Sequence, residues 1–112
     1  MPSLRLRVDA DVTDEFIPDF PFNARREFVE TQGFDYQQPS DNTATAIPTS
    51  KITTMQAMIL QSDKLVTVAM GNITMNPGGL IVLYNCTPAT NPPTVNNNSG
   101  STAKVRGVAF GA

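Results

Sequence analysis

The chain has 112 residues and a formal net charge of −2, with one cysteine, no histidine and no tryptophan. This length suits one domain with a thin core, and the single cysteine excludes an intrachain disulfide. Without histidine, the chain lacks the usual general base at neutral pH and the commonest metal ligand. We therefore expect a protein that is not an enzyme and that binds no cofactor and no metal.

Charge is distributed unevenly along the chain. Residues 1–41 carry four arginines against nine acidic residues, a net charge of −5, whereas residues 42–112 carry four basic residues against one aspartate, a net charge of +3. No cluster of lysine and arginine could neutralise several phosphates, which argues against nucleic acid as a partner. The sequence has neither an apolar signal-peptide core nor a long apolar run, so we expect a cytoplasmic product that does not bind a membrane.

The N-terminal segment begins with a predicted strand. Apolar and charged residues alternate from Leu4 to Val12, the period of two that gives a strand one buried and one solvated face. Two prolines then interrupt a run rich in phenylalanine, so regular structure is not expected to continue there. We divide the chain into residues 1–24, a strand with a proline- and phenylalanine-rich arm, and residues 25–112, a β-sandwich domain.

Two interpretations of the aromatic run remain open. Its apolar side chains either pack onto the chain's own domain or anchor an arm in a groove of a neighbouring subunit. In the second case two arginines would make contacts at the rim of the groove. The predicted partner-binding residues are Phe16, Ile17, Phe20, Phe22, Arg25 and Arg26. The strict alternation upstream also allows the first strand to be an integral part of the main sheet.

Two longer strands that flank a loop come next. Aromatic and β-branched side chains favour a strand over residues 26–36, in which Gly33 indicates a bulge or bend. Polar residues and proline predict a loop over residues 37–50, with a short strand at residues 43–47. Residues 51–61 have a mixed period. Their two threonines favour a strand, because β-branched residues lose rotamer freedom in a helix.

The C-terminal half has clear turn signals. Residues 65–75 are typical of a β-hairpin that turns at Gly71 and Asn72. A type II turn is predicted over residues 76–79, with proline at its second and glycine at its third position. The run Leu80–Tyr84 is apolar at every position, which predicts a central strand covered on both faces.

The last predicted elements are a loop over residues 87–102 and a closing strand over residues 103–110. Cys86 follows an apolar strand, and the chain has no histidine or second cysteine with which it could form a nucleophilic pair. We therefore expect a buried, inert thiol. About seven to eight short strands without a convincing helix predict an all-β protein. The expected fold is an antiparallel β-sandwich or jelly-roll-like barrel with a partly extended N-terminal segment.

Three stretches resemble small β-sandwich structural proteins of tailed-bacteriophage virions: ILQSDKLVTV at 59–68, PGGLIVL at 77–83 and NSGSTAKVRG at 98–107. The resemblance covers about the last half of the chain. It implies a non-enzymatic virion component made in the host cytoplasm, most similar to a capsid decoration or cement protein that bridges coat subunits. The implied partners are the major capsid protein or other virion subunits, with a homo-oligomer in the assembly.

Two other functions fit the same features. A tail, baseplate or head-to-tail component could use a sandwich of this size as a spacer or attachment module. A glycan-binding β-sandwich adhesion module would need aromatic stacking platforms. The absence of tryptophan argues against that function, because only Tyr36 and Tyr84 remain as polar aromatic side chains.

Overall fold

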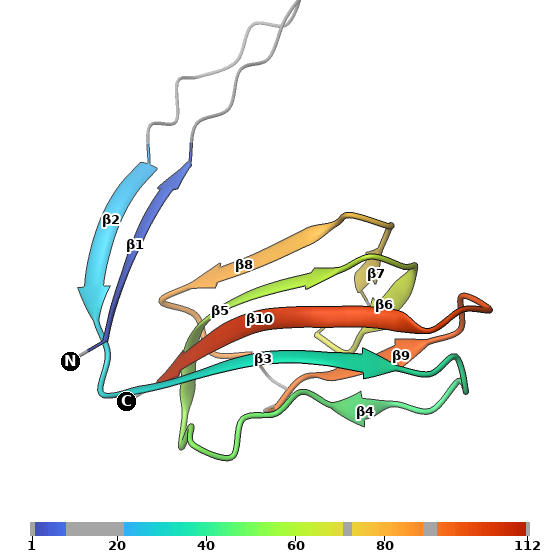
Figure 1. Ribbon diagram of the computed structural model, residues 1–112. Coiled ribbons are helices and arrows are strands. Elements are labelled where there is room, and N and C mark those ends of the chain that lie inside the picture. Colours follow the sequence, from blue (N-terminus) through green and yellow to red (C-terminus); the bar gives the residue numbers. More distant parts are fainter. Residues whose placement is uncertain (1, 9–21, 71–72, 89–91, 112) are drawn as a thin grey trace, which may run out of the picture.

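A computed structural model of the chain describes residues 2–8, 22–70, 73–88 and 92–111. Within these residues it has ten strands and no helix. Two four-stranded antiparallel sheets face each other, and a two-stranded hairpin extends beyond them (Figure 1). The predicted all-β, antiparallel sandwich is confirmed, although it has ten strands where about seven to eight were expected.

The hairpin and the two sheets account for all ten strands. The hairpin pairs β1 (Ser3–Val8) with β2 (Phe22–Glu27). The first sheet has the order β3-β10-β5-β8 and consists of β3 (Glu30–Gln38), β10 (Ala103–Gly111), β5 (Met55–Ser62) and β8 (Leu80–Tyr84). The second sheet has the order β4-β9-β6-β7 and consists of β4 (Thr45–Ala46), β9 (Thr94–Asn97), β6 (Val66–Val68) and β7 (Ile73–Met75).

The main core lies between the two sheets, because each strand alternates inward and outward side chains. On β5, for example, Met58 and Leu60 are buried in this core, whereas Ile59 lies on the outer face of the sheet. The buried residues of the core cluster are Phe34, Ile47, Met55, Met58, Leu60, Val66, Val68, Met75, Val95, Ala103, Val105 and Ala109.

Strand β10 is central to the first sheet, since it pairs with β3 on one side and β5 on the other. Its middle residue, Gly107, permits close packing at this position. A Cβ atom there would overlap the Ile59 carbonyl oxygen and lie 2.9 Å from the Phe34 ring. Any larger residue would therefore have to displace the backbone of β5.

Several local predictions are confirmed. β6 and β7 form the expected antiparallel hairpin, although its turn residues lie outside the described ranges. Before β8, the Gly79 amide donates to the Asn76 carbonyl over 2.8 Å and Gly78 has a φ of 79°. A type II turn requires this positive φ at its third residue. Strand β4 falls within the predicted residues 43–47.

The first strand is confirmed as far as Val8, and its predicted residues 9–12 lie outside the described part of the chain. Its leucines turn inward and its arginines are exposed, as the alternation predicted. β1 pairs with β2 in a separate two-stranded sheet, so among the described residues it is not part of either four-stranded sheet. A hairpin of two strands is marginal by itself and depends on packing.

The prediction of one continuous strand over residues 26–36 is wrong, because two strands meet there. The chain turns at Phe28 and Val29, which separate β2 from β3. The Phe28 amide donates to the Pro2 carbonyl over 2.7 Å, and its buried ring lies 5.1 Å from the Phe110 ring between centroids. This corner, in which Phe28 is buried and Val29 is exposed, ends the hairpin and begins the first sheet.

The predicted bulge at Gly33 is also wrong. Gly33 pairs in register with Val108, and the register of β3 against β10 continues without a shift. The register shift of this sheet occurs instead between Phe110 and Gly111, where β10 pairs with β5.

The predicted loop over residues 87–102 contains a strand, β9, which pairs with β4 and β6. Its Val95 is fully buried, and so is Asn97. The Asn97 amide nitrogen donates to the carbonyls of Gln38 and Ser101, over 2.8 Å each. Polar composition concealed this strand, because an asparagine can be buried when its hydrogen bonds are satisfied.

The prediction that Leu80–Tyr84 is a central strand covered on both faces is wrong. In the part of the chain that the structure describes, β8 pairs only with β5 and forms an edge of the first sheet. Ile81 and Leu83 pack against the core, but Leu80 on the outer face is 56% exposed. An apolar run indicates that both faces of a strand can be buried. It does not indicate whether residues of the same chain or of another molecule bury them.

Candidate functional site

The hairpin has one cationic face. In its register Arg5 lies directly opposite Arg25, and Arg7 lies opposite Asn23 on the same face. The Arg25 guanidinium is 4.0 Å from the Glu27 carboxylate, and both side chains are more than half exposed. Like charges directly opposite each other on a strand pair are destabilising, so this face favours an anionic partner.

The other face of the hairpin is apolar and rests partly on the first sheet. Leu4 and Phe28 are buried against Ala57 and Phe110 at the base of the hairpin. Farther along, the Phe22 ring meets the Tyr84 ring edge to face, with 5.7 Å between centroids. The hairpin is therefore attached through a small apolar contact on the outer face of the first sheet.

Arg26 strengthens this attachment. Its guanidinium donates to the Gln56 side-chain oxygen over 2.7 Å and to the Asn85 side-chain oxygen, and it lies 4.8 Å from the centroid of the Phe28 ring. These bonds join β2 to β5 and to the turn after β8. A cation above an aromatic ring adds a further favourable contact.

The six predicted partner-binding residues have different positions. Phe16, Ile17 and Phe20 lie outside the described residues. Phe22 begins β2 and is 41% exposed although its ring touches Tyr84. Arg25 is exposed on the cationic face, whereas Arg26 is bonded within the chain.

The outer face of the first sheet changes from apolar to charged along its strands. Near the hairpin, Val108, Ile59 and Val82 are neighbours across three strands. In the parallel row two residues farther on, Arg106 lies between Asp35 on β3 and Gln61 on β5. No local sequence pattern indicates this arrangement, because it depends on which strands are neighbours.

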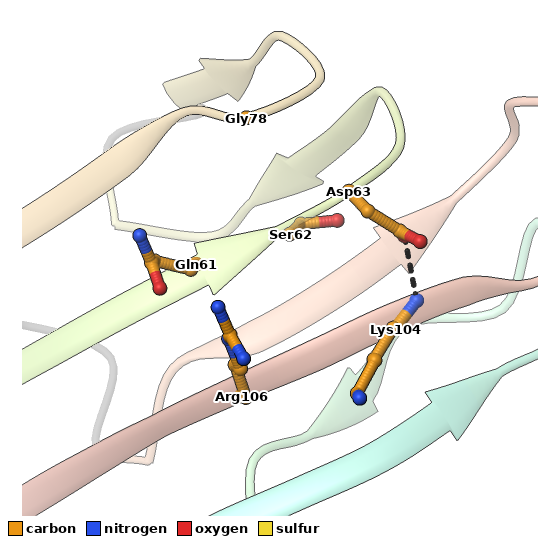
Figure 2. Close-up of a pocket in the computed structure, with 6 residues that line it drawn as sticks. All are labelled: Gln61, Ser62, Asp63, Gly78, Lys104 and Arg106. Carbon is orange, nitrogen blue, oxygen red and sulfur yellow. Dashed lines mark hydrogen bonds between the residues drawn. The ribbon is translucent and has the colours of Figure 1, made fainter.

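A shallow hollow of about 240 Å³ lies at the charged end of this face. Its lining residues are Gln61, Ser62, Asp63, Gly78, Lys104 and Arg106 (Figure 2). The Lys104 amide donates to the Asp63 carboxylate over 2.8 Å, and the Lys104 ammonium lies 3.9 Å from the Asp35 carboxylate. Lys104 and Arg106 could contact a carboxylate, but no activated nucleophile accompanies them among the lining residues. The arrangement of this hollow is one that could bind an anionic group.

Outside this hollow, the chemistry-bearing groups in the described part of the chain are scattered. Among the described residues, no group of three or more histidine, cysteine, aspartate or glutamate side chains could hold a metal ion. Cys86 is exposed, which corrects the predicted buried thiol, and its sulfur donates to the Tyr84 carbonyl over 3.3 Å. It is exposed because it follows an edge strand. Burial raises the pKa of Tyr36, whose hydroxyl donates to the Gln38 side chain.

Comparison with known proteins provides no relative: no family model, no curated protein and no solved structure matches this chain. In the described residues no helix is long and apolar enough to cross a membrane. The hairpin and the outer face of the first sheet are therefore the surfaces from which a function can be inferred.

Proposed function

We propose that this protein is a non-enzymatic structural component of a bacteriophage virion, a capsid decoration or cement protein that bridges and stabilises neighbouring coat subunits. The observation that carries the proposal is the hairpin β1–β2, which extends from a sandwich with its own core (Figure 1). The hairpin has exposed apolar and cationic side chains. The resemblance of residues 59–107 to virion sandwich proteins supports the same assignment.

The hairpin would act as the binding arm. Val8 and Phe22 are exposed on its apolar face, and Phe16, Ile17 and Phe20 in the adjoining segment would add apolar anchors. Arg25 would contact the rim of the partner's groove together with Arg5 and Arg7, which share its face. A carboxylate placed across Arg5 and Arg25 would relieve their repulsion by charge-assisted hydrogen bonds. The partner is therefore expected to offer an apolar groove bordered by acidic side chains.

The sandwich would then serve as the body that spans two coat subunits. One short arm gives a weak contact, but many copies on a symmetric shell bind with combined strength. Such bridging contacts separate only when the shell expands or breaks. The expected effect is a capsid that resists heat and low ionic strength better when the protein is bound.

Deletion of residues 1–24 tests the arm. The shortened chain should keep its strand-rich circular dichroism spectrum, since the core between the sheets loses no residue, and it should no longer co-sediment with capsids that lack the protein. Unchanged occupancy of the capsid would reject the arm.

A double charge reversal, Arg5→Glu with Arg25→Glu, covers the case in which the deletion fails to fold. It should weaken capsid binding at least tenfold, whereas Lys51→Glu outside the hairpin should bind as the wild type does. Equal binding by both variants would contradict the role of the cationic face.

Copy number in purified particles separates the decoration role from the alternative role in a tail, baseplate or head-to-tail connection. Density for many copies distributed over the shell supports decoration. Density confined to the tail axis would replace it with the alternative.

A further inference from the structure

We propose that strand β8 pairs antiparallel with β8 of a second copy of this chain, so that the two first sheets join into one continuous sheet. This inference deepens the proposed function by naming a partner and a surface, and its role in a virion rests on that function. The pairing itself depends only on the described residues and can be tested with the purified chain.

The four sheet edges differ in their protection against pairing. β4 has two residues and β7 has three, which are too short to template another strand. β3 carries the charged residues Glu30 and Asp35. β8 has five residues, with no charge, no proline and no register shift against β5. Proteins protect exposed edges with short strands, charges, prolines or bulges. β8 has no charge, proline or bulge, and it is longer than β4 and β7.

As far as the described residues show, the backbone on the side of β8 away from β5 is available for pairing. A strand that pairs on one side only directs alternate N–H and C=O groups outward. Apart from the pairing with β5, no backbone-to-backbone hydrogen bond of residues 80–84 occurs among the described residues, and at the end of the strand the Tyr84 carbonyl accepts from the Cys86 sulfur. A second strand could therefore add to this edge by main-chain hydrogen bonds, the mode of recognition known as β-augmentation.

The sequence of β8 is complementary to itself. An antiparallel pair with a two-fold axis at Val82 would place Leu80 opposite Tyr84 of the second copy, and Ile81 opposite Leu83. No charged side chain would face another, because the strand contains none. If a strand with charged residues paired with this edge, its charges would lie beside the apolar side chains of β8. A second copy of β8 brings no charge and therefore fits this edge better.

Exposed apolar side chains are concentrated along the same side of the molecule. Five of the seven exposed large apolar residues in the described ranges lie on the hairpin, β7 or β8: Val8, Phe22, Ile73, Leu80 and Val82. Strand β7, at the corresponding edge of the second sheet, is connected to β8 by a short turn (Figure 1). Stable interfaces bury roughly 1,200–2,000 Å² in total. Five strand residues alone are too few for this, and the adjacent strand β7 would provide additional surface, while the apolar face of the hairpin stays available to the capsid.

Disulfide cross-linking tests the register in a Cys86→Ser background. Directly opposite residues of an antiparallel pair have Cβ atoms roughly 4.5–5.5 Å apart, so Val82→Cys should form an intermolecular disulfide under mild oxidation. Leu80→Cys is the matched control. Position 80 lies opposite position 84 of the second copy, so the two cysteines at position 80 would be separated by four residues along the strands, or roughly 13 Å. This variant should remain reduced. Cross-linking of Leu80→Cys as readily as Val82→Cys, or of neither, would overturn the proposed register.

Sedimentation over a range of concentrations tests the association itself. The wild type should dimerise, and Val82→Lys should dimerise at least tenfold more weakly, because it places two cations opposite each other in an apolar interface. Val29→Lys, at an exposed valine outside β8, should dimerise as the wild type does. A wild-type monomer at every concentration, or unchanged dimerisation of Val82→Lys, rejects the inference. A chain that dimerises through β8 but does not bind capsids keeps this inference and rejects the proposed function.

Discussion

The core between the sheets and the contact beneath the hairpin both consist of packed apolar side chains, but they differ in the number of residues that they bury. Among the described residues, twelve buried residues from both sheets and their connections form the core, whereas Leu4, Phe28, Ala57 and Phe110 form the hairpin contact. Hydrophobic stabilisation grows with buried apolar area. The sandwich should therefore unfold cooperatively, while the hairpin can open at lower cost. A stable body with a loosely attached arm is suited to a protein that binds through the arm.

The largest expected effect comes from the centre of the core. Leu60 is fully buried between the sheets, so Leu60→Ala should lower the free energy of unfolding by about 2–5 kcal/mol through lost transfer energy and a cavity. Urea denaturation followed by circular dichroism measures this. Leu65→Ala, at an exposed leucine, should change the same free energy by less than about 0.5 kcal/mol. Similar losses for both variants would contradict the position of the core.

A smaller but clear loss is expected at the buried amide of β9. Asn97 donates to two carbonyls, and its side-chain oxygen accepts from the Ser99 amide over 3.1 Å. Asn97→Ala leaves buried groups such as the Gln38 carbonyl unpaired, which should cost about 1–3 kcal/mol. The exposed neighbour Asn98 provides the control, since Asn98→Ala should be nearly neutral. A neutral Asn97→Ala would show that this network contributes nothing to the second sheet.

Replacement of Arg26 should affect the hairpin and leave the sandwich intact. Arg26→Ala removes the hydrogen bonds to Gln56 and Asn85, which should lower the local stability of the hairpin by about 1.5 kcal/mol. Amide hydrogen exchange in β1 and β2 should then be roughly tenfold faster, while the global urea midpoint changes little. Arg25→Ala should not accelerate exchange, because its exposed ion pair with Glu27 contributes little and its removal relieves the repulsion with Arg5. Equal acceleration throughout β5 and β10 would show that hairpin and sandwich unfold together.

The smallest expected effect is a pH dependence at the margin of the core. Burial raises the pKa of Tyr36 above its ordinary value of 10.0, so the folded state holds the phenolic proton more tightly than the unfolded state. The associated stability is fully present below pH 10 and is lost as the pH rises through the folded-state pKa. The free energy of unfolding of Tyr36→Phe, measured by urea titration, should therefore decline less steeply above pH 10 than that of the wild type. Identical slopes would indicate that Tyr36 is solvated in the folded state.

Features that depend on neighbouring residues in the chain could be predicted. The alternation in β1, the β6–β7 hairpin and the type II turn before β8 follow from side-chain period and turn chemistry, and the structure confirms them. In the candidate site, the sequence indicated Phe22 and Arg25, both of which are exposed on the hairpin.

Features that depend on distant residues could not be predicted. The internal bonds of Arg26 join it to Gln56 and Asn85, and the hollow combines Asp63 with Lys104. No local pattern records such pairs. The polar composition of β9 predicts a loop, but its buried asparagine is satisfied by the Gln38 carbonyl in the other sheet and by the Ser101 carbonyl. The exposure of Cys86 follows from the position of β8 at an edge of its sheet, which the neighbouring residues do not indicate.

The amino-acid sequence by itself determined that this chain would form short antiparallel strands around one thin core, because period, turn residues and the lack of helix-forming stretches act locally. Only the tertiary structure decided the order of those strands. The apolar composition of Leu80–Tyr84 is the same whether its faces are buried by the chain's own sheets or by another molecule. Its position at an edge follows from the pairing of β10 with β3 and β5, contacts that span the length of the chain.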